Sequence, residues 1–322
     1  MKVKTKEEKE RDELNLITLA QEYSSDEKAR AFLESKLWPN GAVCPHCKND
    51  GKTKPNSKLE PKEGSKSAVR KGVYFCGACR EQFTVTVGTI FEGSHMPIGK
   101  WLMAIFILCS SKKSISANQM SRMLKVQYKT AWFMLHRLRH AVAPESPLTN
   151  LLKGTVEVDE TFVGGKGYRC SRYRRQTPVV ALIERGGKMA TRVVSNVTQK
   201  NLGQALNECV DKSATVNTDE HRAYTNPLKE WKKHNTVVHS KYEYKRRNSD
   251  GTISHVNTCE SFFSLLKRGV YGSWHHVSRE HLPKYANEFA FRWNTRGQTD
   301  GERMETAIGM VTGKRLTYRQ VS

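Results

Sequence analysis

Three acidic residues stand at the expected ends of secondary-structure elements. Asp159 follows the apolar run 155–158, Asp219 follows the run 214–218, and Glu260 opens a stretch with helical periodicity. Carboxylates gathered at one point repel one another, so a cluster of this kind is expected to hold cations. Mg²⁺ and Mn²⁺ prefer oxygen ligands, and two or three carboxylates from different elements suffice to hold a pair of such ions. The pattern therefore predicts a Mg²⁺ or Mn²⁺ site.

Other acidic residues lie beside the first two and leave alternatives open. Glu157 shares a strand face with Asp159 by the period of two, whereas Glu160 points to the opposite face. Glu220 directly follows Asp219. Any one of these carboxylates taken alone is more often a capping or surface residue than a catalytic one. The joint placement at element ends favours the three named first.

A lysine accompanies the last of these carboxylates. Lys267 lies seven residues after Glu260. Since an α-helix drifts only about 20° over seven residues, both side chains are expected on one face, two turns apart. A lysine in this position could hold a phosphate beside the metal ions.

Two Cys-x-x-Cys pairs form the second chemical pattern. Cys44 and Cys47 make the first pair, and Cys76 and Cys79 the second. Each pair can place two thiolates at adjacent vertices of a tetrahedron around Zn²⁺. The 28 residues between the pairs exceed the usual spacing, and their polar composition indicates an exposed loop. A redox pair or simple buried cysteines are the alternatives, although neither pair lies in a thioredoxin-like strand-to-helix context.

The other potential soft ligands lack this pairing. His46 lies inside the first Cys-x-x-Cys pair and is predicted to be a solvent-facing spacer, because four cysteines already complete the site. The remaining cysteines are predicted to be small packed or surface residues: Cys109, Cys170, Cys209 and Cys259. One structural zinc ion is therefore expected.

Composition indicates the partner. The 322 residues include 54 Lys and Arg against 32 Asp and Glu, which gives a formal net charge of +22. A basic excess spread along the chain attracts phosphate backbones, so nucleic acid is the leading partner, and the carboxylates then favour phosphodiester chemistry. The alternative is a basic protein whose charge serves solubility or an acidic protein partner.

The chain shows neither a secretory signal nor a membrane segment. Its first residues are charged, and its longest apolar run, 101–109, is too short to span a bilayer. We expect a cytoplasmic protein, where reduced thiols favour metal binding over disulfides. At roughly 100–200 residues per domain, the length suggests two or three domains.

The middle of the chain is predicted to be helical. Short helices are expected within 12–38 and again from residue 97, and a helix ending at Leu124 is followed by another that opens at Tyr128. This pair suggests a helix-turn-helix, with candidate DNA contacts at Lys125, Tyr128, Lys129 and Arg137. Helix pairs with basic surfaces that never touch DNA are common and remain the alternative.

The second half alternates strands and helices. Strands are predicted at 155–163, 178–183, 191–195, 215–218 and 236–239, and helices at 202–210, near 222–231, from 260 and from 280. Such an order predicts an α/β layer fold with functional groups at strand ends. The expected divisions are an amino-terminal helical segment at 1–37, a zinc ribbon at 38–95, the helix-turn-helix region at 96–146, the catalytic domain at 147–300 and a tail at 301–322.

The motifs, taken in order, resemble those of bacterial insertion-sequence transposases of the ISXO-like type. The resemblance extends from about residue 32 to residue 296. It is carried by Trp38–Gly41, Cys44–Cys47, Cys76–Arg80, Gly88–Phe91, Val158–Gly165, Thr218–Tyr224, His255–Phe262, Leu265–Gly269, Tyr271–Gly272 and His275–His276.

The resemblance implies a ribonuclease-H-like domain of the DDE type with a mixed sheet and flanking helices. Asp159, Asp219 and Glu260 would bind the catalytic metal ions, and Lys267 would be the lysine that follows the glutamate. Asn257 is the fallback for the third acidic position, because related transposases vary there. The implied reaction hydrolyses DNA at the element's ends and joins the freed 3′ hydroxyls to target DNA. A dimer or larger assembly on the terminal inverted repeats and target, at the bacterial nucleoid, is implied by the need to handle two ends together.

Further DNA contacts are expected near this site. The candidates are Arg172, Arg174, Arg175, Lys241, Lys245, Arg246, Arg247, Arg268, His275 and His276. Two other functions remain open at this stage. One is a nuclease of the same fold that cleaves without strand transfer, and the other is a regulatory or catalytically inactive DNA-binding protein that uses only the ribbon and the helix pair.

Overall fold

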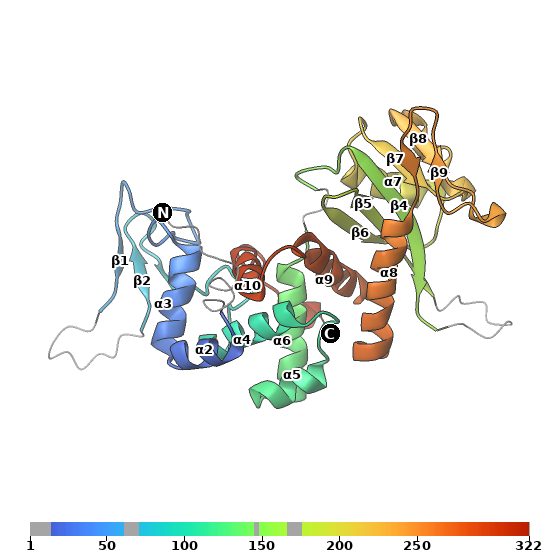
Figure 1. Cartoon of the computed structure of the whole chain (residues 1–322). Coiled ribbons are helices and arrows are strands. Elements are labelled where there is room, and N and C mark those ends of the chain that lie inside the picture. The colour runs from blue at the N-terminus through green and yellow to red at the C-terminus, as the bar shows by residue number, and fades with distance from the viewer. Residues whose placement is uncertain (1–13, 61–70, 145–147, 166–175, 322) are drawn as a thin grey trace, which may run out of the picture. The chain divides into compact units, whose positions relative to one another are not determined.

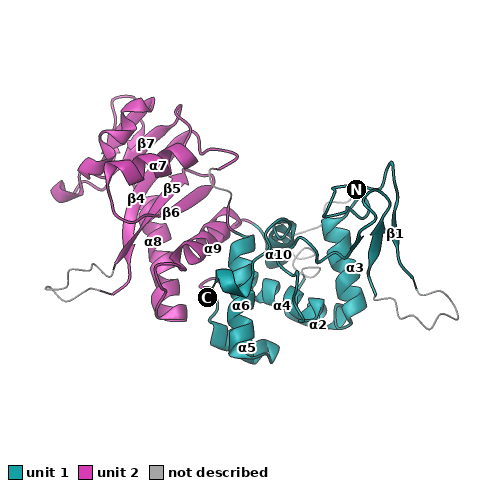
Figure 2. Cartoon of the chain, turned by 180° about the vertical axis from the view of Figure 1, so that it is seen from behind, with its two compact units in different colours: residues 1–111, 115–142, 298–322 teal, residues 112–114, 143–297 magenta. Residues whose placement is uncertain are grey.

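The chain divides into two compact units. The computed structural model describes residues 14–60, 71–144, 148–165 and 176–321. Unit 1 comprises residues 1–111, 115–142 and 298–322, and unit 2 comprises residues 112–114 and 143–297 (Figure 2). The zinc ribbon, the predicted helix pair and the predicted tail therefore fall together in unit 1.

Unit 2 is built on a mixed five-stranded sheet. Its strands run in the order β6-β5-β4-β7-β8, where β6, β5 and β4 are antiparallel and β7 and β8 run parallel to β4 (Figure 1). The strands are β4 (Thr155–Val163), β5 (Thr177–Glu184), β6 (Met189–Val193), β7 (Thr215–Thr218) and β8 (Lys233–Thr236).

The first four predicted strands are confirmed, and the fifth was misplaced. The predicted strand 236–239 shares only Thr236 with β8. The reason is that β8 is an edge strand with half-buried polar residues, and its register is fixed by pairing with β7 through Thr218 and Thr236. Such a strand lacks the alternation of apolar residues on which strand prediction depends.

Helices cover both faces of this sheet. One face packs against α7 (Gln199–Cys209) and two short 3-10 turns, η1 (Arg222–Tyr224) and η2 (Pro227–Glu230). The other face packs against α8 (Asn257–Gly269) and α9 (Leu282–Asn294). The helix predicted near 222–231 is thus two separate turns, because Pro227 lacks an N–H for a continuous helix and instead begins the second turn.

The first part of unit 1 is a small ribbon beside two helices. The helices are α2 (Leu16–Glu22) and α3 (Asp26–Leu37), and the ribbon strands are β1 (Asn56–Lys58), β2 (Tyr74–Cys76) and β3 (Gln82–Phe83) in antiparallel order. Its core holds Cys44, Cys76 and Phe83, with Trp38 and Tyr74 packed against them at a ring-centroid distance of 5.3 Å from each other. So few apolar residues make a weak core unless a metal reinforces it.

The remainder of unit 1 is helical. Helix α4 (Ile98–Ser110) is buried along most of its length, from Trp101 to Cys109 with one half-buried residue between. Helices α5 (Ala117–Leu124) and α6 (Tyr128–Ala141) follow, joined by a three-residue turn in which Lys125 has a φ of 50°. The two helices predicted in this region are therefore confirmed, together with the short connection between them.

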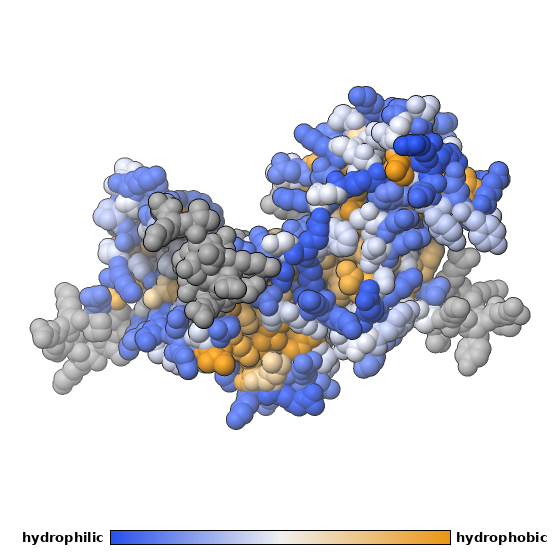
Figure 3. Space-filling view, viewed as in Figure 1, coloured by the Kyte–Doolittle hydropathy of each residue, from blue (hydrophilic) through white to orange (hydrophobic). Residues whose placement is uncertain are grey.

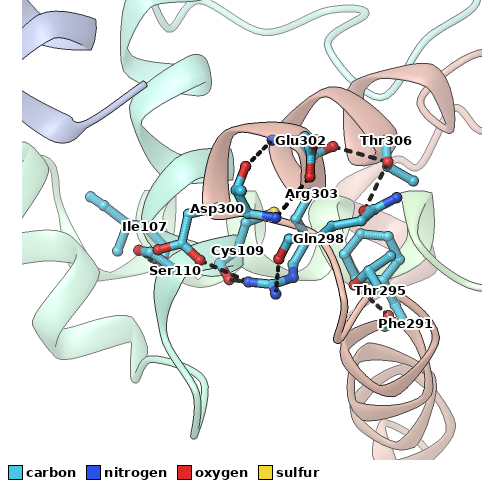
Figure 4. A network of polar contacts seen from close by, with 11 residues as sticks. Ile107, Cys109, Ser110, Phe291, Thr295, Gln298, Asp300, Glu302, Arg303 and Thr306 are labelled. Atoms are coloured by element: carbon cyan, nitrogen blue, oxygen red, sulfur yellow. Dashed lines mark hydrogen bonds and ion pairs between the residues drawn. The ribbon is translucent and has the colours of Figure 1, made fainter. Parts of the chain in front are cut away.

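The predicted tail also folds into unit 1, so this boundary was wrong. Helix α10 (Asp300–Gly309) begins with a capping box of Thr299 and Glu302. Arg303 of α10 donates to the carbonyl of Cys109 at the end of α4 at 2.7 Å and pairs with Asp300 at 2.8 Å (Figure 4). Met304, Ala307 and Ile308 of α10 are also buried, so apolar packing and the Arg303 contact together hold this helix in unit 1.

The surface is largely polar. On the face shown in Figure 3 hydrophilic residues predominate, and hydrophobic residues gather over the part of unit 1 where α2 and α4 lie. Within the described ranges, none of the helices has the length and apolar character needed to cross a bilayer. The other short elements are η3 (His239–Lys241), β9 (Arg246–Arg247), β10 (Ile253–Ser254), the π-helical turn η4 (Val270–Trp274) and η5 (Tyr318–Gln320).

Candidate metal centres

The register of two parallel strands brings the first two carboxylates together. Strand β4 pairs with β7 through Val156 and Val216 and then through Glu157 and Asn217. Continuing two residues along each chain places Asp159 beside Asp219 on the same side of the sheet. Asp219 lies one residue past the end of β7.

Helix α8 brings the third carboxylate close to Asp159 and Asp219. Glu260 lies in its first turn and is half exposed. The N–H of Thr258, in the same turn, donates to the buried Glu157 of β4 at 2.9 Å, and Cys259 packs fully buried against the sheet. The start of α8 is therefore fixed on the strand that carries Asp159. We call Asp159, Asp219 and Glu260 the carboxylate site.

The carboxylate site is electrostatically strained without a cation. Burial, together with the negative charges of Asp219, Glu160 and Glu260, raises the pKa of Asp159 to about 8 against the opposing hydrogen bond from the Glu160 N–H. Among the residues described, no Lys or Arg forms an ion pair with the three carboxylates of the site, and the one basic group at ion-pair distance is His239, whose Nδ1 lies 3.9 Å from Glu260 Oε1. A cluster of acids without a Lys or Arg partner has the chemistry of a divalent-cation site.

The neighbouring acidic residues have other partners. Glu157 is fully buried and pairs with Arg185 at 3.0 Å, and His255 Nδ1 lies 3.2 Å from the same carboxylate. Glu160 accepts the hydroxyl of Tyr224 on the opposite face of the sheet. Both contacts agree with the predicted alternation along this strand and leave Asp159 as the residue of β4 that faces the other two carboxylates.

The remaining neighbour, Glu220, holds a loop. Its carboxylate accepts the backbone N–H groups of His239 at 2.8 Å and Ser240 at 3.0 Å. These backbone hydrogen bonds, that of Ser240 first, lower the pKa of Glu220 to about 2. Glu220 therefore stays ionised and anchors the chain that follows β8.

The sequence did not predict that the Glu157 carboxylate contacts residues from three other segments of unit 2. Its partners come from the end of β5, from the segment before α8 and from the first turn of α8 itself. A signal was present, since a carboxylate in an otherwise apolar strand must find a partner when it is buried. The sequence could not say which partner it finds.

The four paired cysteines converge in unit 1. Their sulfur atoms all lie within 4.8 Å of one another, with Cys44 to Cys79 at 3.7 Å and Cys47 to Cys76 at 3.6 Å. Tetrahedral coordination with Zn–S bonds of about 2.3 Å requires sulfur separations of about 3.8 Å. Of the residues described, these four alone form a group of three or more potential ligands this close together. The arrangement fits a zinc ribbon that binds one zinc ion.

The two cysteine turns have the same backbone design. Lys48 and Arg80 each directly follow the second cysteine of a pair and have φ values of 63° and 64°. Their backbone N–H groups donate to the carbonyls of Cys44 and Cys76, each at 2.9 Å. Burial opposes ionisation of Cys76, but N–H groups of Cys79 and Ala78 outweigh it and lower its pKa to about 6. The second turn thus favours the thiolate of Cys76, whereas burial raises the pKa of Cys44.

The lone soft residues lie outside this site. His46 is exposed and is not part of the group, as predicted. Cys109, Cys209 and Cys259 are buried, also as predicted, and Cys170 falls outside the described residues.

One predicted DNA contact is wrong. Arg137 is only 6% exposed, and its guanidinium donates to the carbonyls of Ile90 at 2.8 Å and Leu316 at 3.1 Å. It stabilises the interior of unit 1 because buried carbonyls need donors. Lys125, Tyr128 and Lys129, by contrast, are exposed around the turn between α5 and α6.

The other basic candidates surround α8 or the loop after β8. Lys267 is half buried and lines a shallow hollow of unit 2 with Lys113, Arg268 and Tyr271. Lys245, Arg246, Arg247, Arg268, His275 and His276 are exposed. Arg172, Arg174 and Arg175 fall outside the described residues.

The geometry defines a protein with a cysteine-rich ribbon and an α/β unit whose three carboxylates come from the central strand β4, the end of β7 and the first turn of α8. Comparison with known families gives this class a name. Residues 151–294 match the ISXO2-like transposase domain, and residues 24–82 match the transposase zinc-ribbon domain. The chain is therefore similar to the ISXO2-like transposases in its α/β unit and to transposase zinc ribbons in its amino-terminal part.

A relative agrees with this assignment. An uncharacterized protein in transposable element ISH50 of Halobacterium salinarum is 29% identical over 313 residues, which cover 89% of this chain and 97% of that protein.

Proposed function

We propose that this chain is a DDE transposase that cleaves DNA at the ends of an insertion sequence and joins the freed 3′ hydroxyls to target DNA. The observation that carries the proposal is the carboxylate site in a domain matched by the ISXO2-like transposase model. In this proposal the mixed sheet is ribonuclease-H-like. The protein works at the bacterial nucleoid as a dimer or larger assembly, because two ends must be handled together.

Asp159, Asp219 and Glu260 would hold two Mg²⁺ or Mn²⁺ ions. Such ions activate the attacking oxygen and neutralise charge on the leaving oxygen of a phosphodiester. Glu157 fixes the first turn of α8, and with it Glu260, against β4. Lys267, on the same helix, would neutralise a phosphate of the bound strand.

The zinc ribbon and the α5–α6 pair would recognise the element's ends. The exposed Lys125 and Lys129 would contact phosphates, and Tyr128 at the start of α6 would approach base edges. The zinc ion would keep the ribbon folded without taking part in the reaction. The net charge of +22 supports association with the phosphate backbone.

The decisive experiment uses end-labelled duplexes that carry the inverted repeats flanking the gene. Incubated with the purified full chain and Mg²⁺, they should yield cleaved ends and longer, joined strands on a denaturing gel. The Asp159→Ala variant should still retard the labelled ends in a gel-shift assay but give neither product. Cleavage by the parent without joined strands would instead identify a nuclease. End binding without either product would identify a DNA-binding regulator.

A further inference from the structure

Two tyrosines project from the loop that follows β8. Tyr242 is 84% exposed and Tyr244 is 55% exposed, more than most large hydrophobic side chains described. We call residues 239–247 the tyrosine loop. Exposed aromatic side chains on a polar surface are typical of binding sites rather than of packing. Nothing in the carboxylate chemistry accounts for them.

The tyrosine loop is held in place by side chains at its base. Glu220 accepts two backbone N–H groups at its start, and Glu243 accepts the N–H of Val238 at 3.0 Å. Glu243 also pairs with Arg246 through two contacts of 2.8 Å. Tyr242 itself has a φ of 58°, a left-handed conformation that is costly for an aromatic residue. Tyr242 therefore keeps an unfavourable backbone conformation while its side chain is exposed.

The loop begins at the carboxylate site. His239 lies 3.9 Å from Glu260, and its ring packs edge-on against Tyr244 with a centroid distance of 5.7 Å. The anchor of the loop, Glu220, is the residue next to Asp219. A strand bound in the carboxylate site would therefore pass beside the tyrosines.

Cations alternate with the tyrosines. Lys241, Lys245 and Arg247 are exposed, and within the described part of the chain no carboxylate lies at ion-pair distance from them. Arg246, in contrast, is neutralised by Glu243. Aromatic rings interleaved with unpaired cations match a nucleic acid strand whose phosphates and base faces are both accessible.

We propose that the tyrosine loop binds unpaired nucleotides of the DNA strand that enters the carboxylate site, by stacking bases on Tyr242 and Tyr244. The proposal deepens the proposed function and rests on it. Paired bases hide their faces inside the duplex, so an intact duplex offers the rings of Tyr242 and Tyr244 no base face to stack on. Single-stranded or frayed DNA offers the faces that the rings can stack on.

The test is a binding measurement in the Asp159→Asn background, with zinc retained and magnesium omitted, so that no strand is cut. The probes are a fluorescently labelled oligothymidylate and a blunt duplex of equal nucleotide count, followed by anisotropy. Tyr242→Ala with Tyr244→Ala should weaken oligothymidylate binding roughly 5- to 100-fold and duplex binding far less. Tyr242→Phe with Tyr244→Phe should restore binding, because the ring is retained.

Ile253→Ala is the matched control, since Ile253 is 47% exposed on the hairpin beside the loop and has no aromatic ring. It should leave both affinities unchanged. Lys241→Ala with Lys245→Ala should weaken binding to both probes and reduce the salt dependence.

The outcomes distinguish the stacking proposal from the proposed transposase function on which it rests. Equal losses on both probes, or no loss on oligothymidylate, would overturn the stacking proposal while leaving a transposase that still cleaves and joins in the gel assay. If the unsubstituted loop in this background bound neither probe and the natural chain cut no DNA, both proposals would fall.

Discussion

The cysteine site and the carboxylate site differ in how they are assembled. The four sulfur atoms lie at nearly the separations of a tetrahedral zinc site, held by two turns of identical backbone design. The three carboxylates come from a strand, a strand end and a helix, and burial followed by repulsion between them raises the pKa of Asp159. Each cysteine turn places two ligands within four residues, so local geometry prepares half of the site. Each carboxylate comes from a separate element, so only tertiary packing brings the three together.

Zinc removal should produce the largest effect, because the ribbon core is small. Replacing Cys76 with Ser should abolish stoichiometric zinc and unfold the ribbon, since structural zinc contributes about 10–16 kcal/mol in small metal domains. Zinc content by mass spectrometry and protease sensitivity of residues 38–83 would measure this. His46→Ala is the control and should keep one zinc per chain. Loss of zinc in that control would return His46 to the ligand set.

Loss of a carboxylate should remove the chemistry and spare binding. Asp219→Asn or Glu260→Gln should slow cleavage at least roughly 10³-fold, because bound ions supply several kcal/mol of transition-state stabilisation. Rates are measured on labelled ends under single-turnover conditions. Asp211→Asn changes an acidic residue of a turn elsewhere in unit 2 and should cleave normally. Near-normal rates in either carboxylate variant would refute the site.

Glu157 should affect metal binding at the carboxylate site by positioning the first turn of α8, which carries Glu260. Glu157→Ala should cost about 3 kcal/mol of unfolding free energy, the low end for a broken buried pair because Arg185 keeps partial access to water. It should also raise the Mg²⁺ concentration needed for cleavage, which a purely stabilising residue would not do. Glu157→Gln retains an acceptor for the N–H of Thr258 and should recover most of the metal affinity. Equal metal affinity in all three proteins would contradict this role.

The smallest expected effect is a pH dependence of stability without magnesium. The folded-state pKa of Asp159, about 8, exceeds its ordinary value, so its contribution is fully present below about pH 4 and is lost as the pH rises to about 8. The magnesium-free protein should therefore lose unfolding free energy relative to Asp159→Asn as the pH rises over this range. Urea unfolding of both proteins measures the difference. Mg²⁺ should reverse the loss only in the parent, and parallel pH profiles would oppose the assignment.

The sequence by itself determined the parts that depend on neighbouring residues. The two Cys-x-x-Cys turns, four of the five sheet strands and the helices around Lys125 follow from short spacings and apolar periods. Glu260 could be selected for the same reason, since it stands where a predicted helix begins, and Asp159 follows an apolar run but lies in the middle of β4. Periodicity also predicted that Glu160 faces away from Asp159, and its contact with Tyr224 agrees.

Only the tertiary structure decided how charged residues are used. Arg137 looked like a surface cation and proved to be a buried donor to Ile90 and Leu316, while Arg303 docks the presumed tail onto α4. Glu157 links elements about a hundred residues apart. A charged side chain carries no periodic signal that distinguishes solvent from a buried partner, because its fate depends on which distant group can compensate its desolvation. That compensation exists only after the chain has folded.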